Sequence, residues 1–120
     1  MKERGCVGAL VDGGVRDVRW MKRHAFPVFA RFRTPTQSIG RWKVNAAQVD
    51  VYLAGATTKR GRVAPGDFIL ADEDGAIVIP AALVEEVLER SEQMTRKEED
   101  IRAELARGLS LADALEKFGH

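Results

Sequence analysis

Apolar residues in the first two thirds of the chain form short runs that end at turn-forming residues, a pattern typical of β-strands. Runs at 6–11, 26–32 and 49–53 predict three strands, and the first is so uniformly apolar that we expect it to be central and parallel in its sheet. We expect Asp12-Gly13-Gly14 to end that strand in a sharp turn, because glycine accepts backbone angles that other residues avoid. A short helix is then predicted over 15–24.

A tight turn and a hairpin are predicted in the middle of the chain. Pro65 presets the backbone angle of the first central turn position, and Gly66 accepts a positive φ at the second. Two strands over 68–71 and 76–79 flank the turn at 72–75, which ends in an Asp-Gly pair typical of β-hairpins. The second strand is therefore expected to return alongside the first.

The last third of the chain has a helical pattern of apolar residues. A long helix is predicted from 81 to 107, with its end at Gly108. Its middle, from 90 to 100, is polar and is expected to face solvent in large part. A second short helix follows, with Ser110 as its cap and Asp113 in the capping-box position.

Strands and helices together predict an α/β fold, organised as a single domain over residues 1–120. The content of 45% apolar and 31% charged residues is ordinary for a globular protein. No run approaches the length of a membrane span, and no signal-peptide pattern follows Met1, so we expect a cytoplasmic protein without a membrane partner. The single cysteine, Cys6, lies in an apolar run and is expected to be buried.

Charge is distributed unevenly along the chain. Residues 1–62 contain 13 lysines and arginines against 4 acidic residues, whereas residues 63–120 contain 6 against 14. Either an anion-binding half or complementary faces within or between subunits would explain this, and a solvated acidic helix with scattered arginines explains it equally well. The basic cluster at 59–62 could attract nucleic acid, but a solvated loop is favoured, so we do not expect a nucleic-acid partner.

Aromatic residues alternate with basic residues between positions 29 and 43, an arrangement that can stack bases. The aromatic and basic side chains do not segregate by strand parity, so core packing is favoured for the aromatic residues. The residues concerned are Phe29, Phe32 and Trp42 with Arg31, Arg33, Arg41 and Lys43.

The junction between the first strand and the first helix is the best candidate for a site, since ligands of α/β folds collect at the carboxyl ends of strands near helix N-termini. Arg16 and Asp17 lie there side by side. A guanidinium matches a carboxylate bidentately, and a carboxylate suits Mg²⁺ or Mn²⁺. Together they could hold an anionic 2-oxoacid and the metal that polarises its carbonyl. By spacing alone, a helix cap beside a surface cation is the more common explanation of such a pair.

Three motifs, in their order along the chain, resemble those of one family. The segment GALVDGGVRD at 8–17 is similar to the signature of the family that contains regulator of ribonuclease activity A and 4-hydroxy-4-methyl-2-oxoglutarate aldolase, of the class II pyruvate aldolase type. The segment at 26–30 resembles the strand that follows in that family, and the segments at 63–67 and 71–80 resemble its hairpin. The resemblance covers nearly the whole chain.

This resemblance implies an α/β fold around a layered β-core with flanking helices, assembled as a trimer. It implies that Arg16 and Asp17 are catalytic, with Arg16 binding the substrate carboxylate and Asp17 anchoring a divalent metal, Mg²⁺ or Mn²⁺. The implied reaction is cleavage of a 4-hydroxy-2-oxoacid to pyruvate by a lyase that also decarboxylates oxaloacetate. Both reactions pass through a pyruvate enolate, whose charge a metal stabilises.

The N-terminal half of the family's fold has no counterpart in this sequence. In the family, that half supplies a Gly-rich loop and an acidic or related residue about twenty positions before the Arg-Asp pair. We therefore expect an N-terminally truncated fold that self-associates through exposed strand edges, and an enzyme that is inactive unless the other half is supplied. The alternative is a noncatalytic regulator that binds a ribonuclease.

Overall fold

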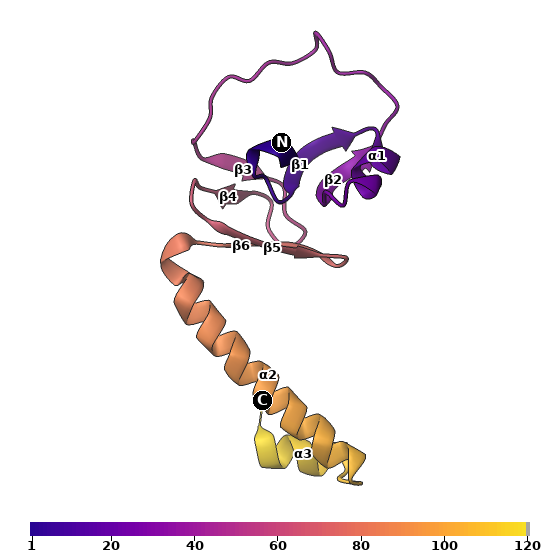
Figure 1. Ribbon diagram of the computed structural model, residues 1–120. Helices are drawn as coiled ribbons and strands as arrows, with labels where there is room; N and C mark the ends of the chain where they lie inside the picture. Colours follow the sequence, from indigo (N-terminus) through magenta and orange to yellow (C-terminus); the bar gives the residue numbers. More distant parts are fainter. Residues whose placement is uncertain (120) are drawn as a thin grey trace. The chain divides into compact units, whose positions relative to one another are not determined.

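The computed structural model describes residues 1–119, which form two compact units, Met1–Pro80 and the residues from Ala81 onward (Figure 1). All strands of the described residues lie in the N-terminal unit, whereas the C-terminal unit consists of helices. This mixture of strands and helices confirms the predicted α/β class.

The N-terminal unit begins with a parallel β–α–β arrangement. After the 3-10 helix η1 (Lys2–Arg4), strand β1 (Ala9–Val15) leads through helix α1 (Val18–Arg23) to strand β2 (Val28–Arg33). β1 and β2 pair in parallel, as predicted. They form a two-stranded sheet, so within the described residues β1 is not the central strand that its apolar sequence led us to expect.

The turn predicted at Asp12-Gly13-Gly14 is wrong, because β1 continues through these residues. The register with β2 shifts between Val11 and Gly14, where β1 contains one residue more than β2, as in a β-bulge. Gly14 lies opposite Phe32, and a Cβ atom at Gly14 would approach the Phe32 ring to 2.4 Å. The missing side chain therefore lets the ring lie over the strand, and β1 ends only at Val15.

Two expectations about burial are also wrong. Cys6 precedes β1 and is exposed, because pairing with β2 begins only at Ala9. Phe32 and Trp42 are 57% and 68% exposed, so they do not pack in a core as favoured from the sequence.

A second pair of strands follows a long segment without helix or strand, residues 34–50. Strand β3 (Val51–Leu53) pairs antiparallel with strand β4 (Gly61–Val63). β3 was predicted, although it begins later than expected. β4 was not predicted, because it has only three residues and its central residue is Arg62.

The predicted turn and hairpin are confirmed. Gly66 has a φ of +92°, the Asp67 N–H donates to the Ala64 carbonyl over 3.1 Å, and the Ala64 N–H donates to Oδ2 of Asp67 over 2.7 Å. The two bonds between Ala64 and Asp67 stabilise the turn from both sides. Strand β5 (Phe68–Asp72) then pairs antiparallel with strand β6 (Gly75–Ile79), so local chemistry determines this part of the fold.

The C-terminal unit contains the 3-10 helix η2 (Ala81–Leu83), helix α2 (Val84–Ala106) and helix α3 (Leu111–Phe118). As predicted, the side chain of Ser110 caps α3 by accepting the Asp113 N–H over 3.2 Å. Gly108, with a φ of +102°, follows α2 where its end was predicted. In the described residues, no helix combines the length and apolarity that a membrane span requires.

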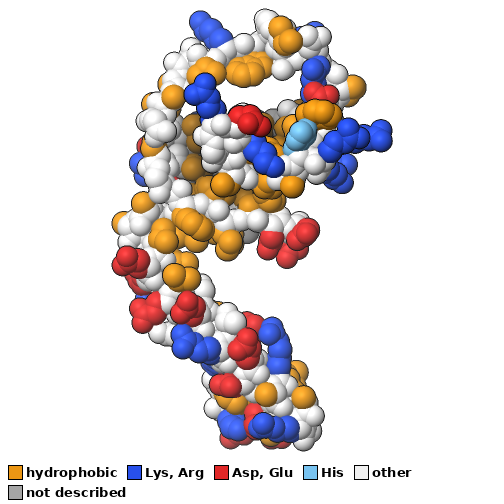
Figure 2. Space-filling view, in the orientation of Figure 1, with side chains coloured by type: hydrophobic (Ala, Val, Ile, Leu, Met, Phe, Trp, Pro, Cys, Tyr) orange, Lys and Arg blue, Asp and Glu red, His pale blue; other side chains and the backbone are white. Residues whose placement is uncertain are grey.

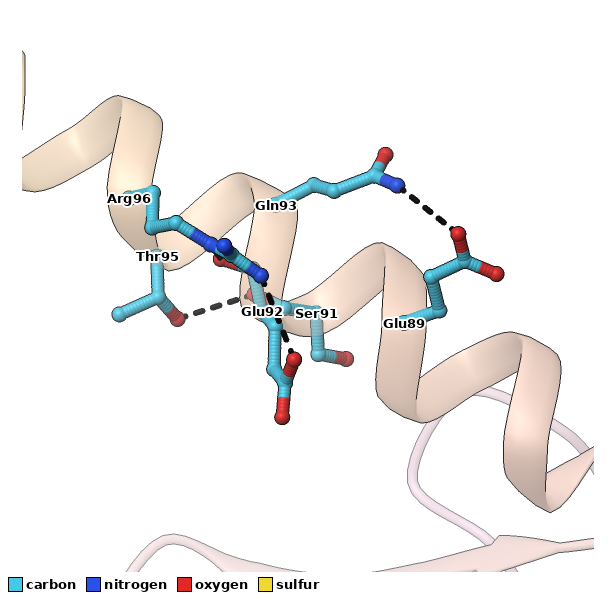
Figure 3. A network of polar contacts seen from close by, with 6 residues as sticks. All are labelled: Glu89, Ser91, Glu92, Gln93, Thr95 and Arg96. Carbon is cyan, nitrogen blue, oxygen red and sulfur yellow. Dashed lines mark hydrogen bonds and ion pairs between the residues drawn. The ribbon is translucent and has the colours of Figure 1, made fainter.

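The polar middle of α2 stabilises itself through contacts one helical turn apart (Figure 3). The Gln93 amide donates to Glu89 over 3.3 Å, and the Thr95 hydroxyl donates to the Ser91 carbonyl over 3.0 Å. Arg96 pairs with Glu92 at 3.3 Å. Exposed side-chain pairs of this spacing, such as Gln93–Glu89 and Arg96–Glu92, each stabilise a helix by a few tenths of a kcal/mol, whereas the Thr95 back-bond does not add to this.

Burial is confined to one place in the described residues. Ala114, in α3, is 2% exposed and is the only buried side chain. Ile101, Leu105, Leu109 and Phe118 are half-buried, and α3 packs on α2. The N-terminal unit contains no buried residue, and Figure 2 shows apolar side chains on its surface.

Candidate functional site

The candidate site lies where β1 passes into α1. Arg16 and Asp17 are the two residues between Val15, the last residue of β1, and Val18, the first of α1 (Figure 1). Because β1 and β2 are parallel, this junction is at the carboxyl end of a parallel pair, the position at which α/β folds bind ligands. The register shift between Val11 and Gly14 lies within β1, so the strand continues beyond the two glycines and the junction follows Val15.

Asp17 has a left-handed backbone conformation, with φ 59° and ψ 31°. It occupies the N-cap position of α1, yet its side chain makes no capping hydrogen bond. Instead its Oδ2 lies 3.1 Å from Nε of Arg16. A non-glycine residue in this conformation costs about 1 kcal/mol or more, and such strain is concentrated at functional sites. The capping explanation of the pair is therefore wrong. Asp17 combines a strained backbone with an exposed carboxylate.

Arg16 lines a hollow of about 340 Å³ beside the carboxyl end of the sheet. A second arginine, Arg41, lines the same hollow, although the two residues are far apart in the sequence. The turn in which the Arg41 N–H donates to the Ser38 carbonyl, over 3.0 Å, contributes to this position. The remaining lining residues are uncharged: Gly14, Phe32, Thr34, Thr36, Gln37 and Ser38. Two cations among hydroxyl and amide groups favour an anionic ligand.

Asp17 lines a different hollow, of about 330 Å³, together with Arg19, Trp20 and Arg23. Its carboxylate is 65% exposed, and the Arg16 side chain is 44% exposed. Arg23 lies over the Trp20 ring, 5.6 Å from its centroid. The two residues of the Arg-Asp pair thus touch each other but open onto separate surfaces.

The described residues do not form a complete metal site. No group of three or more histidine, cysteine, aspartate or glutamate side chains that could hold a metal occurs in residues 1–119. Asp17 alone offers one carboxylate, whereas Mg²⁺ needs an octahedral set of oxygens. A divalent cation at Asp17 therefore requires ligands from outside the described residues or from water.

Three of the other cations that the sequence singled out, Arg31, Arg60 and Arg62, make local contacts. Arg31 pairs with Asp12 across the sheet at 3.3 Å. Arg62 donates from Nε to Asp50 over 2.6 Å, and this hydrogen bond raises the pKa of the guanidinium. Arg60 lies over the Tyr52 ring, 4.8 Å from its centroid. These three cations therefore make contacts within β1–β2 and around β3–β4.

Comparison with known families identifies the N-terminal unit. A family model described as RraA-like, Aldolase/RraA, matches residues 1–78. The chain belongs to the RraA-like family. The match contains the Arg-Asp junction and nearly all of the β5–β6 hairpin, and it ends before α2.

Relatives and solved structures agree with this assignment. The chain is 34% identical over 116 residues to an uncharacterised protein of Methanocaldococcus jannaschii, covering 95% of this chain and 52% of the relative. It is 36% identical over 78 residues to 4-hydroxy-4-methyl-2-oxoglutarate aldolase of Thermus thermophilus, covering 65% of this chain and 44% of the relative. The crystal structure of an uncharacterised protein from Pseudomonas syringae pv. tomato superposes with a TM-score of 0.77 at 27% identity, covering 88% of this chain and 47% of that chain. The chain thus spans about half the length of the curated relatives it matches.

Proposed function

We propose that this chain supplies the substrate-carboxylate-binding part of a 2-oxoacid lyase, a 4-hydroxy-4-methyl-2-oxoglutarate aldolase that also decarboxylates oxaloacetate. The observation that carries the proposal is the position of Arg16, at the carboxyl end of a parallel strand pair and in a hollow that it shares with Arg41. The name of the Thermus thermophilus relative supports the aldolase activity, and membership of the RraA-like family is consistent with it.

In this proposal, Arg16 binds the carboxylate next to the reacting carbonyl of the 2-oxoacid. A guanidinium holds a carboxylate in a fixed plane, so it orients the adjacent carbonyl for cleavage of the bond that leaves a pyruvate enolate. Arg41 would bind a second carboxylate, since both 4-hydroxy-4-methyl-2-oxoglutarate and oxaloacetate are dianions. The uncharged hydroxyl and amide groups of the same hollow would hydrogen-bond the remaining oxygens.

Asp17 is proposed to contribute one oxygen ligand to a divalent cation, Mg²⁺ or Mn²⁺. The Asp17 carboxylate is exposed, makes no capping hydrogen bond and contacts Arg16 through Oδ2, which supports this role. The other ligands have to come from outside the described residues or from water, and the activity of this chain depends on them.

A coupled lactate dehydrogenase assay tests the proposal by measuring pyruvate release from 4-hydroxy-4-methyl-2-oxoglutarate and from oxaloacetate. When the other half of an RraA-like fold is supplied, we expect turnover with Mg²⁺ that EDTA abolishes. We also expect a loss of at least about 100-fold in Arg16→Ala, because a charge-assisted bidentate contact is removed. Arg102→Ala is the matched control, since Arg102 lies on α2 in an exposed pair with Glu98.

Turnover that survives Arg16→Ala would exclude the proposed role of Arg16. A complete absence of turnover, combined with retention of a ribonuclease on the immobilised chain, would favour the noncatalytic alternative.

A further inference from the structure

Helix α1 presents a cationic face to solvent. Its apolar residues, Val18 and Met21, are half-buried and line a hollow together with residues of β2. The exposed positions of the helix, here called the α1 outer face, carry three cations and one aromatic ring: Arg19, Trp20, Lys22 and Arg23. At 3.6 residues per turn these four positions form one continuous stripe, so their side chains are neighbours on the helix surface.

Neighbouring carboxylates do not neutralise this charge. The segment 18–49 contains seven lysines and arginines and no aspartate or glutamate. Within residues 1–119, the three cations of the α1 outer face take part in no ion pair. The Lys2 ammonium donates to the carbonyl of His24, directly after α1, and adds a further cation at this end of the helix. Figure 2 shows Lys and Arg side chains gathered over α1. Such a concentration of one charge attracts a polyanion.

Trp20 adds a flat ring to the cationic stripe. The residue is 59% exposed. The Arg23 guanidinium lies 5.6 Å from the centroid of the Trp20 ring, and the ring of His24 meets it edge-on with a centroid separation of 4.6 Å. These contacts orient the ring while most of it stays accessible. Single-stranded nucleic acid binds to such surfaces, because a base stacks on the aromatic ring and the phosphates contact the cations.

The hollow around Trp20 favours a strand over a free nucleotide. It has a volume of about 330 Å³, and Asp17 supplies its one carboxylate. Oδ2 of Asp17 lies 3.1 Å from Arg16, so a cation offsets this negative charge. Pockets for small ligands enclose most of their ligand, whereas Trp20 is too exposed to be part of such an enclosure. A strand gains affinity from contacts repeated along its length and does not need to be enclosed.

Two other polyanions fit the α1 outer face less well. An anionic membrane binds an amphipathic helix through a broad apolar face, but α1 has only six residues, and Val18 and Met21 line the hollow beside β2. An acidic polypeptide would satisfy the cations but would leave the Trp20 ring without a base to stack on it.

We propose that the α1 outer face binds single-stranded nucleic acid, with one base stacked on Trp20 and successive phosphates on the three cations. Cations one helical turn apart are about 5–6 Å from each other at Cβ. Phosphates of one strand are about 3.4 Å apart or more along its axis, so long side chains can reach successive ones. The surface is separate from the basic cluster at 59–62, from which the sequence argued against a nucleic-acid partner. It also does not include the hollow of Arg16 and Arg41, so it is independent of the proposed lyase activity.

The test titrates the full chain into a fluorescein-labelled single strand of about 12 uridines, a length that one small binding surface can occupy. Fluorescence anisotropy measures the association constant. We expect saturable binding whose logarithm falls with the logarithm of salt concentration at a slope of about −2, as for three phosphate contacts on a single strand.

Trp20→Ala should weaken binding at least about fivefold, because one stacked base is lost. Trp42→Ala is the matched control. Trp42 is 68% exposed, but it lies in the segment 34–50, which has no helix or strand, so its substitution should leave the affinity unchanged.

Lys22→Ala should make the salt slope shallower by about 0.7, the share of one phosphate contact. The control Arg90→Ala removes an exposed cation of α2 that pairs with Glu86, and it should leave the slope unchanged.

Equal weakening by Trp20→Ala and Trp42→Ala would overturn the assignment to α1. Equal affinity for poly-L-glutamate would overturn base stacking and identify an acidic polypeptide as the partner. Binding to phosphatidylserine vesicles without binding to the oligonucleotide would identify a membrane instead. No saturable binding at a salt concentration of about 50 mM, at which phosphate contacts are strong, would overturn the proposal as a whole.

Discussion

The two units of this chain reach order by different routes. The C-terminal unit satisfies its hydrogen bonds within α2 and α3, caps α3 with Ser110, and closes on Ala114, its one buried side chain. The N-terminal unit consists of strand pairs that need neighbours on both sides, and it buries nothing. The comparison shows that helices satisfy their backbone hydrogen bonds within one segment, whereas strands, apart from the β5–β6 hairpin, pair with residues farther along the chain.

The largest effect is expected from a charge at Ala114, which tests whether the C-terminal unit depends on its one buried side chain. We expect Ala114→Glu to lower the free energy of unfolding of the C-terminal unit by about 3 kcal/mol, because a larger, charged side chain would replace a methyl group at 2% exposure. Urea unfolding followed by circular dichroism measures the loss. The control Ala112→Glu lies two residues away on the exposed side of α3 and should change stability by less than about 0.5 kcal/mol. Equal effects of the two variants would show that α3 does not depend on this contact.

Substitutions of Asp17 test whether its left-handed backbone conformation lowers the stability of the N-terminal unit. Asp17→Gly should raise the free energy of unfolding by up to about 1 kcal/mol, since glycine adopts the observed φ of 59° without steric cost. Asp17→Val should lower it by about 1–2 kcal/mol, because a β-branched residue is strained there. Chemical unfolding of the chain measures both changes. If glycine destabilises as much as valine, the Asp17 side chain, and not its backbone, determines the effect.

The smallest expected effect sharpens the account of how α3 is held on α2. Glu104 accepts a hydrogen bond from Lys117 over 3.0 Å and pairs with Arg107 at 2.8 Å. The hydrogen bond from Lys117 is the main cause that lowers the pKa of Glu104 below its ordinary 4.5. A carboxyl with a lowered pKa contributes its stability fully above the ordinary value, and that contribution is lost as the pH falls through the lowered pKa.

Thermal unfolding between pH 6 and pH 2 measures this contribution. In Glu104→Gln the decline of the midpoint on acidification should be shallower than in the unmodified chain. Glu99→Gln, an exposed glutamate on the same helix, is the control and should follow the unmodified chain. A Glu104→Gln curve that parallels the unmodified one would show that the contacts of Glu104 do not stabilise the packing of α3.

Local chemistry explains which elements were predictable. The Pro65-Gly66 turn, the β5–β6 hairpin and the Ser110 cap each depend on residues within a few positions of one another, and all were predicted correctly. The family resemblance also located the Arg-Asp pair, and the structure places it at the end of a parallel strand. The roles of these two residues remain proposals.

Three features were decided by contacts between distant residues. Gly13 and Gly14 are typical of a turn, but pairing with β2 and the ring of Phe32 keep them in β1 as a bulge. Cys6 belongs to an apolar run, yet it is exposed because pairing starts at Ala9. Arg41 shares a hollow with Arg16, and nothing in the sequence between them signals that meeting.

The amino-acid sequence by itself therefore determined the family, the hairpin and the helix ends, because turns, caps and motifs are chemistry over a few adjacent residues. The tertiary arrangement decided the register between β1 and β2, the hollow that Arg16 and Arg41 share, and the exposure of apolar side chains on the β5–β6 hairpin. These depend on which distant backbones pair and on which surfaces remain uncovered, and neither is a property of any local stretch of the chain.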